Sequence, residues 1–137
     1  MKKIFVAIDG SEPAIHAARM ALDFASKTGG EVTLVHVIPN LMIPSEVPFA
    51  TGELAEDVMK NGELLLEHAA KELGQPNLRR ICLNGTPAER LTDLAEEESA
   101  DLIVIGSKGR GAVSRMLIGS TTDRLIHISK KPVLVVR

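Results

Sequence analysis

Residues 102–121 read LIVIGSKGRGAVSRMLIGST, and this stretch holds the pattern that decides the fold. Its first five residues form a short, continuously apolar run, which is typical of a strand buried on both faces of a parallel sheet. A glycine-rich loop follows, and it ends in Ser120 and Thr121, residue types that are common where a helix starts. The stretch therefore predicts a strand, a long loop and a helix in succession.

The same alternation of short apolar runs and longer segments of helical period extends to both sides. Runs rich in β-branched residues predict strands at 3–9, 31–38, 79–83, 102–106 and 133–136. Segments of helical period predict helices from Ser11 to Gly29, over about 53–73, from Thr86 and from about Ser120. Strands that alternate with helices indicate α/β architecture: an open, doubly wound, five-stranded parallel sheet with helices on both faces.

Side-chain patterns give these predicted helices their buried faces and ends. In the first helix, one face of mostly small residues lets the helix lie close to the sheet: Ala14, Ala18, Ala21, Leu22 and Ala25. In the third, Thr86 and Glu89 have the spacing of a capping box. In the fourth, we expect the core to take Leu125, Ile126 and Ile128.

Length and composition bound the classes of protein to consider. The 137 residues predict one domain over 1–137, and 16 Lys and Arg against 18 Asp and Glu give a net charge of −2. This balance argues against a general nucleic-acid binder, and the absence of Trp and Tyr argues against recognition by base stacking. No apolar run approaches the length that spans a bilayer, so no membrane partner is expected. Cys82 is the only cysteine, and the first apolar run breaks at Asp9, so we expect a cytoplasmic protein.

The loop after residue 106 has the composition of a phosphate cradle. No acidic residue lies between Asp101 and Asp123, and the intervening segment carries glycines and cations: Gly106, Lys108, Gly109, Arg110, Gly111, Arg115 and Gly119. Glycines let backbone N–H groups turn toward a ligand, and the helix start at Ser120 and Thr121 favours an anion. The alternative is that the glycines only permit turns and the cations lie on a solvated surface.

Better-known motifs of α/β proteins do not fit. Gly106 and Gly111 have the spacing of a Walker A loop, but Ala112 and Val113 follow where lysine and a hydroxyl residue are needed. The dinucleotide fingerprint should follow the first strand, which ends instead in IDGSEP, so a nicotinamide cofactor is not expected. A phosphorelay receiver needs paired acids there and an Asp after the third strand, where Asn84 stands.

Two residues separate Gly106 from Gly109, and nine more separate Gly109 from the pair Gly119 and Ser120. The segments AIDGSE, LVHVIP and PVLVV lie at 7–12, 34–39 and 132–136. In this G-2x-G-9x-G-S/T pattern and in these segments, the sequence resembles the nucleotide-binding branch of the universal stress protein family. The resemblance covers essentially the whole chain. It implies an adenine nucleotide alpha hydrolase-like, Rossmann-like sheet of strand order 3-2-1-4-5 and a homodimer.

The resemblance also implies a ligand and roles for particular residues. ATP or ADP, with magnesium, would bind between the first and fourth strands. Asp9 would contact the ribose or the metal, and the backbone at Val37 would read the adenine edge. The phosphates would be held by Gly106, Gly109, Gly119, Ser120 and Thr121. Lys108 and Arg110 join the candidate nucleotide-binding residues because the loop composition places positive charge there, and Arg110 is not a fixed part of the family pattern. Without the resemblance, Asp9 is equally well explained as a turn residue, and Ser120 and Thr121 as helix caps.

Other residues and segments receive plainer interpretations. His36 is expected to be a packed, hydrogen-bonded histidine and Cys82 a buried thiol, and the remaining histidines lack metal-ligand spacing. The proline-rich stretch from Pro39 to Gly52 is expected to be irregular, either a flap over a ligand or a surface loop.

Two functions remain after these exclusions. No nucleophile elbow or paired carboxylates suggest fast catalysis, so the first is a regulatory, stress-response nucleotide sensor that is at most a slow ATPase. The second is a homodimeric interaction module that binds no nucleotide, joined through the apolar terminal strand Val133–Val136. Its protein partner is not identifiable from the sequence.

Overall fold

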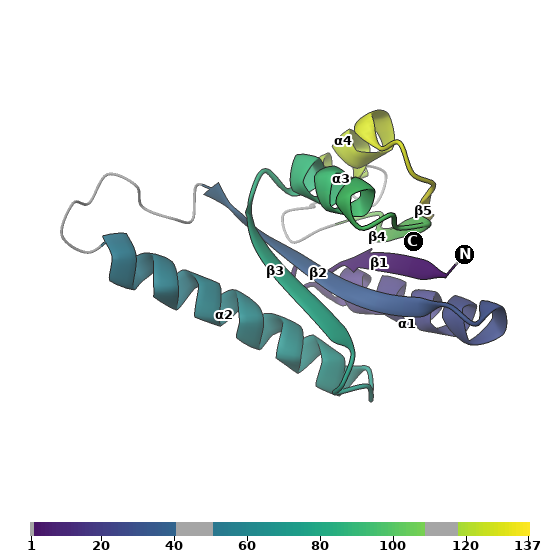
Figure 1. Cartoon of the computed structure of the whole chain (residues 1–137), viewed down its shortest axis with the longest axis horizontal. Coiled ribbons are helices and arrows are strands. Elements are labelled where there is room, and N and C mark those ends of the chain that lie inside the picture. The colour runs from purple at the N-terminus through teal and green to yellow at the C-terminus, as the bar shows by residue number, and fades with distance from the viewer. Residues whose placement is uncertain (1, 41–50, 109–117) are drawn as a thin grey trace.

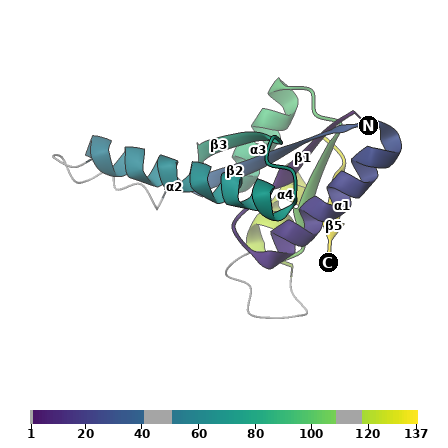
Figure 2. The same ribbon diagram turned by 90° about the horizontal axis from the view of Figure 1, so that it is seen from below.

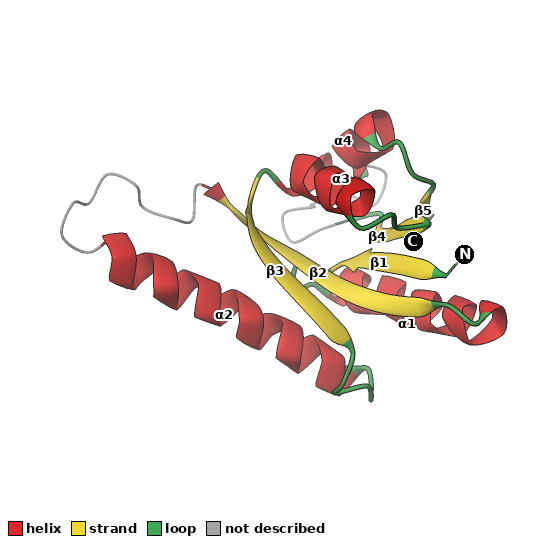
Figure 3. Cartoon of the chain, in the orientation of Figure 1, coloured by secondary structure: helices red, strands yellow, loops and turns green. Residues whose placement is uncertain are grey.

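The computed structural model describes residues 2–40, 51–108 and 118–137. Strands and helices alternate from the first element to the last (Figures 1 and 3). The elements are β1 (Lys3–Ala7), α1 (Glu12–Thr28), β2 (Glu31–Pro39), α2 (Thr51–Glu72), β3 (Arg79–Gly85), α3 (Pro87–Glu97), β4 (Leu102–Gly106), α4 (Ser120–Ile128) and β5 (Val133–Val136). Within the described ranges, no helix has the length and apolar character that crossing a membrane requires.

The strands form one five-stranded sheet of order β3-β2-β1-β4-β5, in which every pair is parallel. The predicted fold class and strand order are therefore confirmed. The predicted strand ends differ by up to two residues: β1 stops at Ala7 instead of Asp9, whereas β3 continues to Gly85 and β2 to Pro39. Pro39 lies opposite Gly85 in the sheet, so it belongs to β2 and not to the irregular stretch. Residues 41–50 of that stretch lie outside the described residues.

Two layers of helices enclose the sheet. Helices α1 and α2 cover one face and α3 and α4 the other, and Figure 2 shows the α1 and α2 side from below. Strand β1 supplies both cores, because successive side chains of a strand point to opposite faces. Ile4 and Val6 are buried under α1 and α2, whereas Phe5 is buried under α3 and α4. Burial on both faces, which the continuous apolar runs predict for the first, fourth and fifth strands, is confirmed for β1 and β4. It is wrong for β5, whose first three residues are half-buried because β5 lies at the edge of the sheet.

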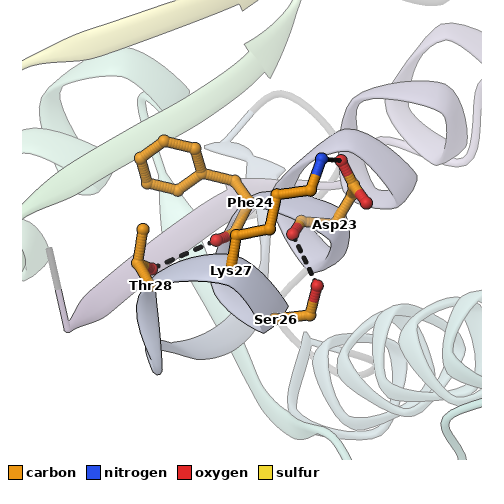
Figure 4. A network of polar contacts seen from close by, with 5 residues as sticks. All are labelled: Asp23, Phe24, Ser26, Lys27 and Thr28. Carbon is orange, nitrogen blue, oxygen red and sulfur yellow. Dashed lines mark hydrogen bonds and ion pairs between the residues drawn. The ribbon is translucent and has the colours of Figure 1, made fainter.

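Helix α1 lies against the sheet through its predicted face of small residues. All four of the predicted alanines are buried: Ala14, Ala18, Ala21 and Ala25. Ser11 caps the start of the helix and accepts a hydrogen bond from the Ala14 amide. At its end, Figure 4 shows the side chains of Ser26, Lys27 and Thr28 turning back to the preceding turn, and Gly29 closes the helix with φ of 74°.

Two predictions about the helices on the opposite face are wrong. Thr86 is the N-cap of α3, but its side chain makes no capping hydrogen bond, and Glu89 instead accepts a hydrogen bond from Arg124 on α4. Ile126 is 43% exposed, because the buried face of α4 is set by Thr122 and Leu125, three residues apart. Ile128 packs partly against the core, as predicted.

Candidate functional site

The loops after β1 and β4 leave neighbouring strands toward opposite faces of the sheet. Strand β1 pairs with β4, yet β1 leads into α1 on one face and β4 leads toward α4 on the other (Figure 1). This is the switch point at which open α/β sheets bind ligands, beyond the carboxyl ends of the strands. The sheet order thus brings the Asp9 turn and the glycine-rich loop to adjacent strand ends, as expected.

Asp9 forms a tight turn between β1 and α1. Its Oδ1 accepts a hydrogen bond from the Ser11 amide at 2.9 Å and a second from the Ser11 hydroxyl. Gly10 supports the turn with φ of 86°, in the left-handed region that glycine tolerates best. The turn role of Asp9 is therefore observed, and a contact with a ligand stays a prediction.

Val37 lies on β2 beyond the point where β1 stops. The Val35 carbonyl accepts a hydrogen bond from the Ile8 amide, so the backbone polar groups of Val35 face β1. Because backbone groups of a strand alternate in direction, those of Val37 face the same side, past the last residue of β1. The Val37 side chain is buried in the core under α3 and α4. Of Val37, only the backbone therefore faces the space beyond the end of β1, and a contact with a ligand stays a prediction.

Gly106 ends β4 in close contact with the first turn of α1. A Cβ at this position would lie 3.0 Å from the backbone oxygen of Pro13 and 3.1 Å from its carbonyl carbon. Packing of α1 on β4 is therefore sufficient reason for a glycine here. It also ties the end of β4 to the segment that carries the Asp9 turn.

The glycine-rich loop is closed at its base by two hydrogen bonds. The Gly119 amide donates to the Ser107 carbonyl at 2.8 Å, and the Thr122 hydroxyl donates to the Gly106 carbonyl at 2.7 Å. The Ser107 amide in turn donates to the Val136 carbonyl of β5. Both ends of the loop are thereby held together at the carboxyl end of the sheet.

Helix α4 begins directly at this closure. Gly119 is its N-cap, so Ser120 and Thr121 are its first two helical residues and not caps. The leading amides of an α-helix have no acceptor within the helix, and together with the helix dipole they favour an anion. Lys108 lies just past the closure and is half-buried. Gly109 and Arg110 lie outside the described residues.

A groove of about 550 Å³ lies between the start of α1 and the second half of α2. It includes Gly10, but its charged lining is predominantly acidic, with Glu12, Glu67 and Glu72 against Lys71. A phosphate group would be repelled by this set of carboxylates. The groove is therefore a poorer candidate for a phosphate site than the switch point.

His36 and Cys82 lie side by side on β2 and β3, under α2. His36 is hydrogen-bonded through Nδ1 to the Ile8 carbonyl at 2.6 Å, so its predicted packed role is confirmed. Burial raises the pKa of the Cys82 thiol, and the nearby Glu63 carboxylate adds to that effect. Cys82 is half-buried, somewhat more exposed than predicted. Among the described residues, no three His, Cys, Asp or Glu side chains are grouped so as to hold a metal ion.

Comparison with known proteins identifies the family. The sequence profile of the universal stress protein family matches residues 1–137. The chain belongs to the universal stress protein family. It is 33% identical to universal stress protein MJ0531 of Methanocaldococcus jannaschii, in a match covering 99% of this chain and 82% of that protein. The family resemblance read from the sequence is thus confirmed.

Solved structures of similar proteins share the fold. The structure of hypothetical protein MJ0577, from the same organism, has a TM-score of 0.85 at 35% identity and covers 98% of this chain and 94% of its own. A universal stress protein in complex with cAMP has a TM-score of 0.74 at 24% identity, with 99% of this chain and 97% of that chain covered. At that identity the second likeness shows the fold alone.

Two residues of the loop base were missed by the sequence analysis. Ser107 acts through its backbone, which no residue-type pattern can reveal. Thr122 did leave a signal, because it lies three residues before Leu125, a position predicted to be buried. A hydroxyl on the buried face of a helix needs a hydrogen-bond partner outside solvent, and here that partner is the Gly106 carbonyl.

Proposed function

We propose that this protein binds ATP or ADP at the switch point between β1 and β4 and acts as a regulatory nucleotide sensor in the stress response. The observation that carries the proposal is the closed base of the glycine-rich loop, which sets the start of α4 beside the end of β4. Such a helix start attracts phosphate. The family pattern from Gly106 to Ser120 supports an adenine nucleotide as the ligand.

In this proposal the ligand extends along the carboxyl end of the sheet. The Val37 backbone reads the adenine edge, Asp9 contacts the ribose or an accompanying Mg²⁺ ion, and Lys108 adds positive charge near the phosphates. The phosphates are held by the backbone of Gly106 and Gly119 and by Ser120 and Thr121. Gly109, from the family pattern, and Arg110, from the positive charge of the loop, complete the set on the basis of the sequence alone.

Fast catalysis is not part of the proposal. The groups proposed to contact the phosphates are backbone amides, hydroxyls and cations, which stabilise negative charge but do not act as a general base. Magnesium and these groups would support slow hydrolysis at most. A reducing compartment such as the cytoplasm suits a chain whose only cysteine is Cys82.

Calorimetric titration of nucleotide-stripped protein with ATP and Mg²⁺ tests the proposal. We expect saturable binding near one nucleotide per chain. At free ATP about 100 times Kd, the folded state should gain about 2.7 kcal/mol, seen as a higher unfolding temperature. Absence of heat and of any thermal shift at millimolar ATP, in folded protein, would contradict it.

A Gly119→Val variant localises the site. Gly119 has φ of −61° and ψ of 154°, a conformation that valine also adopts, so the variant should fold. Its side chain should obstruct the phosphates and lower ATP affinity by about tenfold or more, a loss of roughly 1.4 kcal/mol. Ile126→Ala, on the exposed side of the same helix, is the control and should bind ATP normally. Unchanged affinity in folded Gly119→Val would argue against this location.

An edge strand favours a second function, association of two copies of this chain. Strand β5 pairs only with β4 among the described strands, and its first three residues are half-buried. The Pro132 carbonyl accepts a hydrogen bond from Ile103 of β4, and the Val136 carbonyl accepts one from Ser107, directly after β4. Strand alternation therefore turns the backbone groups of Val133 and Val135 outward. We propose that this edge pairs with the same edge of a second copy to form a homodimer. Such a dimer does not require a nucleotide, so it is also compatible with the alternative function, an interaction module that binds none.

Proline at an outward position tests the dimer. Val135→Pro removes an N–H that does not serve the β4 pairing, so it should block pairing between copies while leaving the sheet intact. Val135→Ala is the control, because it loses similar packing but keeps the N–H. Sedimentation should show monomers for the proline variant and dimers for the alanine variant. Dimers in both would exclude the edge-pairing arrangement.

A further inference from the structure

The hydroxyl of Thr122 makes a different hydrogen bond from those of two other helical threonines. Thr28 and Thr92 donate to the carbonyls of Phe24 and Ala88, each four residues earlier in the same helix. This is the usual local bond of a helical threonine. Thr122 instead donates out of α4 to the Gly106 carbonyl, 16 positions away, at 2.7 Å. Its hydrogen bond joins two elements, so it does more than satisfy the helix.

Burial makes this bond a constraint on geometry. Thr122 is only 3% exposed, and the bond is itself buried, so water is not placed to replace either partner. Gly106 also packs closely on the first turn of α1, where a Cβ would lie only 3.0 Å from the Pro13 oxygen. The Gly106 carbonyl is therefore a firm anchor. Thr122 transmits its position to the first turn of α4.

The residues next to Thr122 are those proposed to meet the phosphates. Ser120 and Thr121 immediately precede it in the first turn, and Gly119 bonds to Ser107 one position beyond Gly106. Two hydrogen bonds thus fix the direction in which the leading amides of α4 point. An anion site made of such amides depends on that direction, because the N–H groups must converge on one ligand group.

We infer that Thr122 is a positioning residue of the phosphate site: its buried hydroxyl holds the first turn of α4 to the end of β4 and contacts no ligand itself. This inference rests on the proposed nucleotide site. It assigns to Thr122 an effect on the phosphate part of the ligand, with little effect on the adenosine part, which lies at Val37 and Asp9 in the proposal.

The test compares two ligands in two variants. Thr122→Val keeps the branched shape but removes the donor, and Thr122→Ser keeps the donor but removes the methyl group. Affinities for ATP and for adenosine are measured by displacement of a fluorescent adenine nucleotide. We expect Thr122→Val to lower the affinity for ATP about tenfold, which corresponds to 1.4 kcal/mol. Its affinity for adenosine should fall by less than about twofold. Ser should retain ATP affinity within about twofold to threefold of the wild type.

Each outcome separates this inference from the function on which it rests. Wild-type protein that does not bind ATP would contradict the proposed function. Wild-type binding with undiminished ATP affinity in Thr122→Val, or an equal loss for both ligands, would overturn the positioning role and leave the nucleotide site standing. If the valine variant does not fold, Thr122→Ala replaces it, because its smaller side chain admits water to the Gly106 carbonyl, and the same two affinities decide.

Discussion

The two ends of the sheet are held together by different kinds of hydrogen bond. Where the strands begin, the Asp101 carboxylate accepts the amides of Lys2 and Lys3 at the surface, at 2.8 and 2.9 Å. Where they end, the neutral Thr122 hydroxyl donates to the Gly106 carbonyl in the interior. A charged, exposed bond depends on pH and salt, whereas a buried neutral bond does not. We therefore expect the proposed anion site at the second end to keep its shape as solution conditions change.

The largest expected effect comes from overfilling the end of β4. Gly106→Ala places a methyl group 3.0 Å from a backbone oxygen of α1, and backbone cannot move aside as a flexible side chain can. We expect a loss of about 1–3 kcal/mol in the free energy of unfolding, and more for Gly106→Val. Urea denaturation without ligand measures both.

The order of the two variants is the informative part of that experiment. A loss that grows with side-chain size would confirm that close packing on Pro13 requires the glycine. Wild-type stability in both variants would mean that the end of β4 is as tolerant as an exposed edge, and the comparison between the two ends would fail.

A smaller effect, confined to acid, is expected at the other end. Hydrogen bonds from the backbone amides of Lys3 and Lys2 lower the pKa of Asp101. A lowered pKa means that the carboxylate stabilises the fold above its unfolded value, near pH 4, and that this contribution is lost as pH falls through the folded value. Asp101→Asn should therefore lose less stability than the wild type as the pH falls below about 4.

Thr122→Val sharpens the contrast in the same pH series. It should lower stability by a similar amount at every pH, because the bond it removes has no titrating partner. Urea denaturation at several pH values gives the change in stability with pH for each variant and for the wild type. A steeper acid loss in Asp101→Asn than in the wild type would contradict the role assigned to the carboxylate.

Local pattern was enough to predict most of the fold. Apolar runs with β-branched residues located the strands, and the spacing of Ala14, Ala18, Ala21 and Ala25 located the face of α1. Each of these features depends on residues that are close neighbours in the sequence. The glycine spacing from Gly106 to Ser120 was likewise enough to indicate the family, because all of these residues lie in or next to one loop.

What the sequence could not supply are partners far apart in the chain. Glu89 has the spacing of a capping box with Thr86, but Arg124, 35 positions away, takes its carboxylate. Lys2 and Asp101 are 99 positions apart, and no spacing rule connects them. The same holds for Thr122 and Gly106, whose bond exists only once β4 and α4 are packed. The candidate site was thus predicted as a set of residues, and its closure was not.

The smallest expected effect concerns the ion pair between Arg79 and Glu98, where the strands begin. Arg79 donates to both carboxylate oxygens of Glu98, at 2.6 and 3.0 Å, and this lowers the pKa of Glu98. The Arg79 side chain is nevertheless 54% exposed, so water competes with Glu98 for its guanidinium group. Arg79→Gln should cost less than about 1 kcal/mol at low salt.

Salt then separates the charge of this pair from its packing. At about 1 M salt the screening length falls to roughly 3 Å, so the difference between Arg79→Gln and the wild type should shrink toward zero. The loss in Gly106→Ala should persist at the same salt, because a steric conflict is not screened. A salt-independent loss in Arg79→Gln would show that the arginine stem contributes by packing on its neighbours, and the exposed end of the sheet would then be held in part by the same kind of force as the buried one.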